Sequence, residues 1–450
     1  MSAGLELTSI PSHQRTASTL DVALLFAGAN VVSSTLITGA TLGAATTLDR
    51  ALAALLLGLV VGTLPLAVLA RTGPRYGLPS MLLLRVPFGR LGAATVSALL
   101  VVTNFAWIGL NNQVAAGAFA ALVDGDGSGV ASSDRPGPEG ALGGLAPILA
   151  DPTVGSVVVG AAAIAVALFG PAAMARFDRV AVPLMVLLGV ALTVALVRGL
   201  GDGAPLVQQS PGPARPLGVL AGLDLVIGYQ VSWSLMFADY TRYQRSEAAA
   251  SRAVFFGLTL TSGWLMTLGL IAARTVGSND PAQLVLASGL PAAALLVLAL
   301  ATVTTNFVNL YLSALAIRTQ AAAAPHRATI VVVGLVGTAL SAADQRLLDR
   351  YAAFMGLLAT LLLPIVAIAL VHFFWLRRGD RDAGSATSST TAVSFLPAWI
   401  AWAAGAATYQ AIARLAPAVG ATGATLVVAA LVYLGASPLA GAGRGPVREA

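Results

Sequence analysis

The chain has 450 residues, of which 57% are hydrophobic and only 10% are charged. Soluble domains carry about 25% charged residues, so this composition excludes an ordinary soluble domain and predicts an all-α polytopic membrane protein. The net charge is +6, which in a soluble protein would suggest a nucleic-acid partner. Here the basic residues lie in loops, where they set membrane topology, so no nucleic-acid partner is expected. The absence of cysteine from the sequence excludes disulfides, thiolate metal sites and cysteine nucleophiles.

About twelve apolar runs are long enough to cross a bilayer, for which an α-helix needs about 20 residues. With the N-terminus in the cytoplasm, 17 of the 25 basic residues, all arginine, fall on the cytoplasmic side, as the positive-inside rule requires. We therefore expect a multi-pass protein of the plasma (inner) membrane with both termini in the cytoplasm, and a monomer. The expected spans are 21–46, 51–70, 90–123, 154–170, 180–198, 217–238, 254–275, 288–317, 328–343, 352–375, 396–413 and 418–437.

The first ten spans show a weak internal repeat. Gly28-Ala29-Asn30 interrupts the first span and Gly228 the sixth, an offset of 200 residues. Because each copy has five spans, the second copy must be inverted, an architecture of secondary transporters whose sites lie where the breaks meet. The expected domains are a cytoplasmic N-terminal tail (1–20), repeat 1 (21–198, with an external loop at 124–150), repeat 2 (217–376), a cytoplasmic linker (377–395) and peripheral helices 11 and 12 with the C-terminal tail (396–450).

Polar side chains gather on one face of the third span. Asn104, Trp107 and Asn111 are spaced i, i+3, i+7 and therefore share a helical face. An indole with amides beside it suits a flat polar heterocycle, which would stack on the ring and hydrogen-bond at its edge. The alternative is a buried Trp with amides that join neighbouring helices.

Small and oxygen-bearing residues in the first and eighth spans indicate a cation site. Gly28, Ala29 and Asn30 would let the first span unwind and free backbone carbonyls. Thr304 and Thr305 would add hydroxyl oxygens, which suit Na⁺. Helix packing and hydroxyl bonds to the helix's own carbonyls are the alternatives. No carboxylate lies near the centre of spans 1, 3 or 8, which favours Na⁺ over H⁺ and a substrate without fixed charge.

The sixth span is followed directly by Asp239-Tyr240-Thr241-Arg242-Tyr243. Tyr belongs in the aromatic belt of a membrane protein and Arg on its cytoplasmic side, so this segment reads as an interfacial cap. The alternative is an ion-pair latch between Asp239 and Arg242 that breaks and re-forms during transport.

Four stretches give the chain a family resemblance. It resembles the nucleobase:cation symporter family, which holds bacterial cytosine and purine permeases and a hydantoin transporter. The resemblance implies a LeuT-like fold, with a 5+5 inverted repeat and two extra helices. The stretches are Phe26-Ala27-Gly28-Ala29-Asn30 with Gly39-Ala40, a Gly-Pro loop followed by Arg85-Val86-Pro87-Phe88-Gly89, Trp107 with Asn111, and Ala238-Asp239-Tyr240-Thr241-Arg242-Tyr243.

The resemblance also implies that a base sits between an aromatic residue of span 3 and one of span 6. Trp107 matches the first aromatic, and Asn111, one turn on, matches the family's amide. In span 6 the match is looser, because Tyr229 or Gln230 falls at the aromatic position and Trp233 lies a turn further.

In the eighth span the family supplies hydroxyl ligands for Na⁺ and an amide for substrate. Thr304 and Thr305 match the hydroxyls, while Asn306 and Asn309 both compete for the amide position. Na⁺ or H⁺ would be the coupling ion, and no cofactor or further metal is expected.

The sequence as a whole predicts a secondary active transporter, not an enzyme, since no acid–base pair or nucleophile constellation appears. It would import a neutral nucleobase, cytosine or a purine, or a related heterocycle, by alternating access. The favoured coupling ion is Na⁺, and H⁺ is the alternative. One alternative is a symporter of the same fold for hydantoin or allantoin, thiamine or an amino acid. Another is a channel or membrane receptor, although a channel would line a pore with rings of polar groups.

Overall fold

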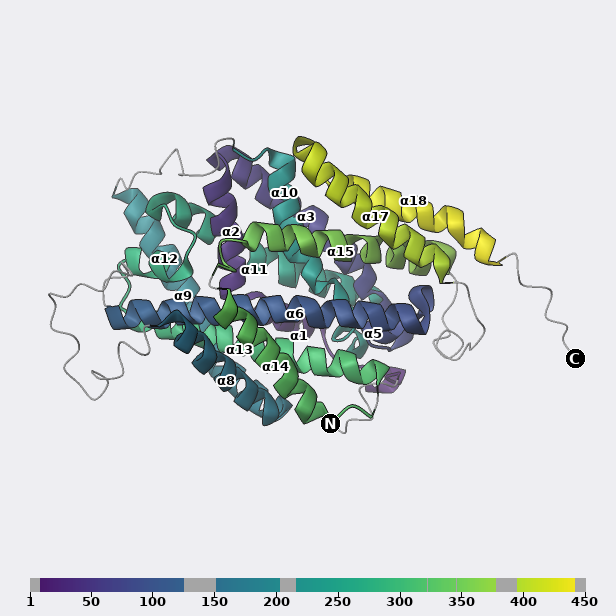
Figure 1. Cartoon of the computed structure of the whole chain (residues 1–450), viewed down its shortest axis with the longest axis horizontal. Coiled ribbons are helices and arrows are strands. Elements are labelled where there is room, and N and C mark those ends of the chain that lie inside the picture. Colours follow the sequence, from purple (N-terminus) through teal and green to yellow (C-terminus); the bar gives the residue numbers. More distant parts are fainter. Residues whose placement is uncertain are drawn as a thin grey trace, which may run out of the picture.

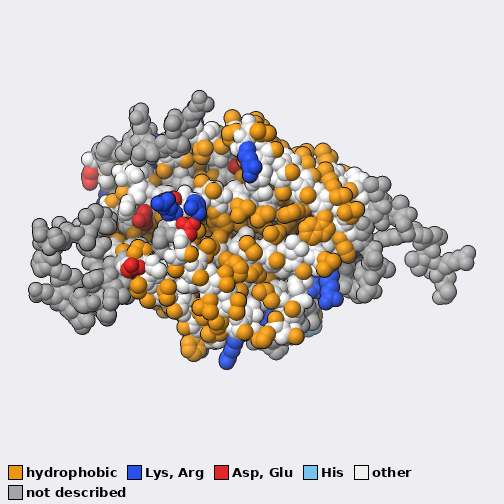
Figure 2. Space-filling view, in the orientation of Figure 1, with side chains coloured by type: hydrophobic (Ala, Val, Ile, Leu, Met, Phe, Trp, Pro, Cys, Tyr) orange, Lys and Arg blue, Asp and Glu red, His pale blue; other side chains and the backbone are white. Residues whose placement is uncertain are grey.

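A computed structural model describes residues 9–124, 151–202, 216–321, 323–344, 346–377 and 395–441. Within these ranges every regular element is a helix and none is a strand, so the predicted all-α class is confirmed. Most of the external loop at 124–150 and of the linker at 377–395 lies outside the described residues. Figure 2 shows a face of the molecule covered by hydrophobic side chains with few charged groups, as a lipid-facing surface requires.

Each of the twelve expected spans coincides with a helix or helix pair in the described part of the chain (Figure 1). Eight helices there are long and apolar enough to cross a membrane, or nine when a bent pair counts as one span. The helices are α1 (Thr19–Asn30) with α2 (Ser33–Ala45), α3 (Leu48–Ala70), α6 (Arg85–Asp124), α8 (Pro152–Leu168), α9 (Pro171–Gly201), α10 (Val219–Val231), α11 (Glu247–Val276), α13 (Ala293–Gln320), α14 (His326–Ala343), α15 (Tyr351–Val371), α17 (Leu396–Leu415) and α18 (Thr422–Gly441).

The first span is broken slightly later than predicted. Gly28, Ala29 and Asn30 remain in the last turn of α1, and the chain leaves the helix at Val31 and Val32 before α2 departs at 62°. Two consecutive β-branched residues favour extended backbone. The Asn30 carbonyl, left free by the break, accepts a hydrogen bond of 2.6 Å from the Thr35 hydroxyl.

The predicted interruption of the sixth span at Gly228 is wrong. α10 continues through Gly228 to Val231 and then tightens into a 3₁₀ helix, η3 (Ser232–Met236). Gly228 instead permits close packing, because a Cβ there would lie 2.4 Å from the Met355 carbonyl oxygen on α15. The observed helix ends, Asn30 in α1 and Val231 in α10, keep nearly the predicted offset, since 231 − 30 = 201.

Helices from the two halves of the chain interlock in two groups. α2 and α3 pack against α10 and α11, and α6 and α8 pack against α13 and α14. The tightest contact joins α2 to α11, where a Cβ on Gly39 would lie 1.8 Å from the Met266 carbonyl oxygen, and one on Gly269 2.0 Å from that of Leu36. Small residues let membrane helices approach backbone to backbone in this way.

Gly269→Ala is therefore expected to lower the midpoint of thermal unfolding in detergent, by an overpacking cost of about 1–3 kcal/mol. Gly263→Ala on the same helix is the matched control, because its Cβ would meet only Leu59 Cδ1 at 3.4 Å. That variant should be neutral or slightly stabilised, since Ala favours helix over Gly by about 1 kcal/mol. Equal midpoints for both variants would refute the backbone contact between α2 and α11.

Two peripheral helices, α17 and α18, lie along α15 at one edge of the molecule (yellow in Figure 1). Trp402 Nε1 on α17 donates to the Leu361 carbonyl on α15 at 2.9 Å. Asp224 on α10 caps the start of α18, because its carboxylate accepts from the backbone N–H groups of Ala421 at 2.6 Å and Thr422 at 3.1 Å. A carboxylate at a helix N-terminus is stabilising, so this contact anchors the peripheral pair to the core.

Candidate functional site

An aromatic cluster lies where the two halves of the chain meet. The ring centroids of Trp107 on α6 and Tyr229 on α10 are 6.1 Å apart in an edge-to-face arrangement. Both side chains are buried, with exposed fractions of 8% and 2%. Two further rings come from α15, Tyr351 at 6.4 Å and Phe354 at 5.0 Å from Trp107. Sequence reasoning missed these two, because their span reads as a plain apolar helix.

Hydroxyl groups tie this cluster to the break in the first span. The Tyr229 hydroxyl lies 2.6 Å from Thr35 Oγ1 and donates to Asn30 Oδ1 at 3.0 Å. The Tyr351 hydroxyl lies 2.6 Å from Thr38 Oγ1 and donates to the Ser34 carbonyl at 3.0 Å. A shift of α2 is thus coupled to both tyrosines that face Trp107.

Asn30, a predicted cation ligand, holds the broken helix against α11. Its Nδ2 donates to Ser262 Oγ at 2.6 Å, Thr261 Oγ1 at 2.9 Å and the Leu258 carbonyl at 3.3 Å. Its carbonyl accepts from Thr35 and its Oδ1 from Tyr229. The side chain therefore acts as a structural tether in this conformation.

The other predicted cation ligands keep oxygen lone pairs available. The hydroxyls of Thr304 and Thr305 donate to the Ala301 carbonyl at 2.6 and 3.0 Å, and each oxygen retains acceptor capacity. The Gly28 carbonyl accepts the Val31 N–H at 3.2 Å. Neutral carbonyl and hydroxyl oxygens of this kind are ligands that suit Na⁺.

Some side-chain amide atoms of spans 3 and 8 have a hydrogen-bond partner and others have none. Asn306 is fully buried and committed to α6, since its Oδ1 accepts from Asn111 Nδ2 at 3.0 Å and its Nδ2 donates to Asn112 Oδ1 at 2.8 Å. Asn111 Oδ1 and Asn309 Nδ2 are buried without a partner. The site thus keeps one acceptor on α6 and one donor on α13, whereas Asn306 joins the two helices.

The three span-6 candidates point in different directions. Tyr229 is the one that contacts Trp107. Gln230 lies against α3, where a Cβ on Gly62 would come within 3.0 Å of its Cβ, and both its amide atoms are buried and unpaired. Trp233 packs edge-on against Phe26, with ring centroids 6.1 Å apart. Gln230 thus packs its Cβ against α3 and leaves a buried donor and a buried acceptor unpaired.

Asp239 is half-buried, at the end of span 6 predicted to be cytoplasmic. One carboxylate oxygen accepts from the Ser80 hydroxyl and from the Ser80 N–H, and the Ala238 N–H donates to Ser80 Oγ at 2.9 Å. Burial raises the pKa of Asp239 above its ordinary value, against the opposing effects of Ser80 and the positive charge of Arg242. Arg242 stacks on Tyr243, with 5.2 Å from the guanidinium carbon to the ring centroid.

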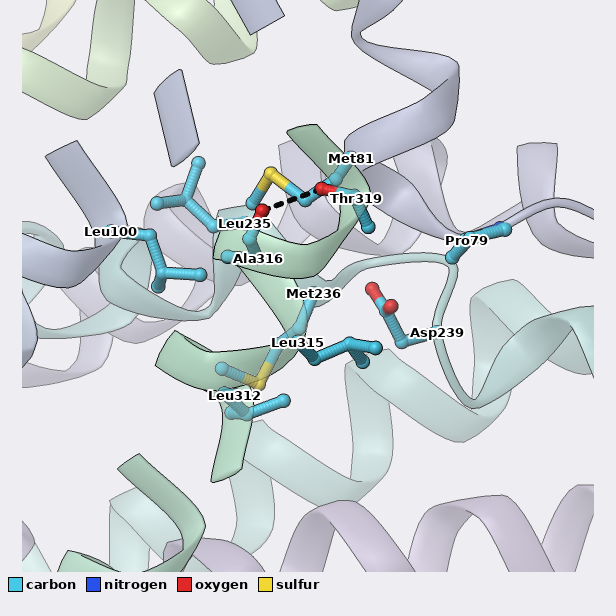
Figure 3. Close-up of a pocket in the computed structure, with 10 residues that line it drawn as sticks. All are labelled: Pro79, Met81, Leu100, Leu235, Met236, Asp239, Leu312, Leu315, Ala316 and Thr319. Carbon is cyan, nitrogen blue, oxygen red and sulfur yellow. Dashed lines mark hydrogen bonds between the residues drawn. The ribbon is translucent and has the colours of Figure 1, made fainter. Parts of the chain in front are cut away.

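A small cavity of about 20 Å³ lies beside Asp239 (Figure 3), room for about one water molecule. Its walls come from α6, η3 and α13, and from α5 (Ser80–Leu83). Leu100 lies seven residues before Trp107 on α6, so the cavity is about two helical turns from the aromatic cluster. The lining residues are Pro79, Met81, Leu100, Leu235, Met236, Asp239, Leu312, Leu315, Ala316 and Thr319.

A helical membrane bundle with changes of helix geometry at matching positions, next to a buried aromatic and amide site, has the architecture of a secondary transporter. The family model described as "Permease for cytosine/purines, uracil, thiamine, allantoin" matches residues 9–437. The chain belongs to this family of permeases. Its homologues are transporters of small substrates in membranes.

Relatives and solved structures agree with this assignment. The cytosine permease of Escherichia coli (strain K12) is 26% identical over 377 residues, covering 84% of this chain and 82% of that protein. The inward-facing conformation of Mhp1 matches with a TM-score of 0.78 at 16% identity, over 98% of this chain and 94% of that one. Mhp1, a nucleobase-cation-symport-1 family transporter, also matches in a closed conformation with bromovinylhydantoin bound. The TM-score is 0.74 at 17% identity, over 98% of this chain and 96% of that one. The predicted LeuT-like fold class is thereby confirmed.

Proposed function

We propose that this permease imports a neutral nucleobase, cytosine or a purine, or a related heterocycle, by alternating access coupled to a cation. The observation that carries the proposal is the buried contact between Trp107 and Tyr229, with an unpaired amide acceptor and donor at the α6–α13 boundary. An aromatic face binds flat rings of any base, and amides supply both kinds of hydrogen bond to its edge.

Substrate would enter beside Trp107 by parting the edge-to-face rings. Asn111 Oδ1 and Asn309 Nδ2, which have no partner among the described residues, would gain one from the substrate edge. Relieving a buried unpaired group is worth about 1–3 kcal/mol. A base with both an N–H and a ring nitrogen or carbonyl fits this pair, whereas an amino acid zwitterion would bring two charges to a site of amides and aromatics.

Na⁺ is the proposed coupling ion. It would bind between the first-span break and the Thr304 and Thr305 hydroxyls, where the available ligands are neutral oxygens. Binding there would order the broken helix, and Tyr229 is bonded to that break through Asn30. The two ligands would then raise each other's affinity, as a coupling free energy requires.

Asp239 and Ser80 would form the inner gate. Their hydrogen bond joins the end of span 6 to the segment leading into α6, and the cavity beside them holds only about one water. Movement of the group α2, α3, α10 and α11 against the group α6, α8, α13 and α14 would break this bond. It would open a route from the aromatic cluster to the cytoplasm. The protein would work as a non-enzymatic carrier, as a monomer in the plasma membrane, with both termini in the cytoplasm.

Uptake into proteoliposomes tests the proposal. Labelled cytosine, uracil, hypoxanthine, hydantoin and thiamine would each be offered under an inward Na⁺ gradient, a pH gradient or neither. We expect saturable, Na⁺-dependent accumulation of at least one base. No uptake of any flat heterocycle would refute the substrate class. Uptake driven by the pH gradient alone would refute Na⁺ coupling, and non-saturable flux would favour a channel.

A further inference from the structure

A groove of about 440 Å³ lies on the outside of the second helix group, which comprises α6, α8, α13 and α14. The groove is separate from the aromatic site. Its walls are Val166 and Phe169 at the end of α8, one face of α9, and Leu300 of α13. Phe169 is 80% exposed and Val180 of α9 is 60% exposed, so the groove opens to the surface of the molecule. The volume far exceeds the roughly 10–15 Å³ that one water needs. All but one of the described side chains that line the groove are apolar.

The exception is Arg176, which lines the groove near the start of α9. Residues 180–197, the next part of α9, carry no charge, and Arg198 follows them. These residues span about 27 Å, close to the hydrocarbon thickness of roughly 30 Å. Arg176 and Arg179 therefore lie at one membrane surface and Arg198 at the other. The α8–α9 connection is on the side predicted to be cytoplasmic.

No hydrogen bond or ion pair joins Arg176 to any other residue that the structure describes. Asp178, the nearest acid in sequence, interacts electrostatically with Tyr240 beyond η3 and does not line the groove. Arg176 is thus a cation without a described counter-charge, held at the mouth of an apolar groove at the membrane surface.

We propose that this groove binds an anionic phospholipid, with its phosphate on Arg176 and an acyl chain along Phe177. A guanidinium matches phosphate oxygens in a two-bond geometry. Basic pockets between membrane helices bind anionic headgroups. The apolar walls would take the chain that a free phosphate lacks, so the groove selects a lipid.

The bound lipid would act on the helices that build the amide site. Phe177 packs edge-on against Phe307 of α13, with ring centroids 5.8 Å apart. The preceding residue, Asn306, is hydrogen-bonded to α6. Filling the groove would therefore hold α9 against α13 and stabilise the second helix group.

Native mass spectrometry of the full chain in detergent, with added phosphatidylglycerol or phosphatidylethanolamine, tests the proposal without any transport assay. We expect the protein to retain phosphatidylglycerol in the mass spectrum and not phosphatidylethanolamine. In a thermal unfolding measurement, phosphatidylglycerol should raise the midpoint of unfolding and phosphatidylethanolamine should not. Arg176→Gln should weaken phosphatidylglycerol binding at least tenfold. Glycerol phosphate, a headgroup without a chain, should not compete at equal concentration.

Arg179→Gln is the matched control, because it removes the same charge three residues away from a side chain that does not line the groove. It should retain the lipid. Ala173→Trp, which fills the groove and keeps every charge, should lose it, so the proposal can be tested even if Arg176→Gln does not fold. Equal retention of the two lipids, equal loss in both arginine variants, or unchanged binding to Ala173→Trp would overturn the proposal.

Discussion

Trp107→Ala is expected to weaken substrate binding by about 10–100-fold while the protein stays folded. Base–aromatic stacking is worth roughly 1–3 kcal/mol per base, and each 1.4 kcal/mol is about a factor of ten. The indole is also the ring that Tyr229, Tyr351 and Phe354 all contact. Its loss therefore removes the surface against which the cluster is arranged. Binding would be measured by scintillation proximity with whichever heterocycle the uptake assay identifies.

Two further variants separate stacking from folding. Trp107→Phe keeps an aromatic face and should recover much of the affinity. Trp264→Ala removes an indole of α11 that bonds Thr193 Oγ1 at 3.0 Å and lies outside the aromatic cluster, so it should leave affinity unchanged. The stacking role of Trp107 is wrong if its Ala variant binds like the wild type, or if Trp264→Ala loses as much affinity.

The arrangement of the spans could be predicted because it follows from local chemistry. Apolar runs of fixed length and the arginine distribution define membrane helices without any knowledge of their partners. Each expected span has its helix among the described residues. The exact bounds of the two repeats, 21–198 and 217–376, and of the peripheral pair with its tail, 396–450, stay a prediction.

The positions of the helix breaks could not be placed by composition alone. Small residues suggest both flexibility and tight packing, and Gly228 serves the second role against Met355. In the first span α1 ends at Asn30, and the side chain of that residue is bonded to α11. Such a bond depends on a partner 232 residues away, which a local pattern does not contain.

The walls of the site were predicted unevenly for the same reason. Trp107 and Tyr229 stood out, because polar or aromatic residues are conspicuous in an apolar span. Phe354 contacts the same indole but is an ordinary residue of an apolar helix. Asn306 is the amide whose side chain α6 engages, and the sequence pattern does not separate it from Asn309.

Asp239→Asn is expected to slow transport about tenfold and yet to stabilise the protein at neutral pH. Asn has the same shape and can still accept both Ser80 donors, but it does not carry a charge. Burial raises the pKa of Asp239, so the charged form disfavours the closed gate and favours opening into water. Each pKa unit corresponds to about 1.4 kcal/mol. The neutral amide removes this drive, and the closed conformation gains population.

The pH dependence gives this prediction a definite sign. The pKa of Asp239 is higher in the folded, closed protein than in water. Its protonated form therefore stabilises that state below the ordinary carboxyl pKa, and this stabilisation is lost as pH rises through the raised value. Wild-type turnover should accordingly increase with pH over that interval. Asp239→Asn should show no such increase, and its excess stability should vanish at low pH.

Accessibility of the gate can be measured directly, because the chain has no cysteine. A single Thr319→Cys substitution places a thiol in the cavity wall beside Asp239 (Figure 3). Adding Asp239→Asn should reduce its labelling by a polar maleimide about tenfold, in parallel with turnover, because the route opens less often. Asp280→Asn is the matched control, since Asp280 is another carboxylate whose pKa burial raises, and it caps α12 (Pro281–Ala287) by accepting from Ala282 N at 2.9 Å. Labelling that falls equally in both backgrounds, or that rises with Asp239→Asn, would show that Asp239 does not drive the opening.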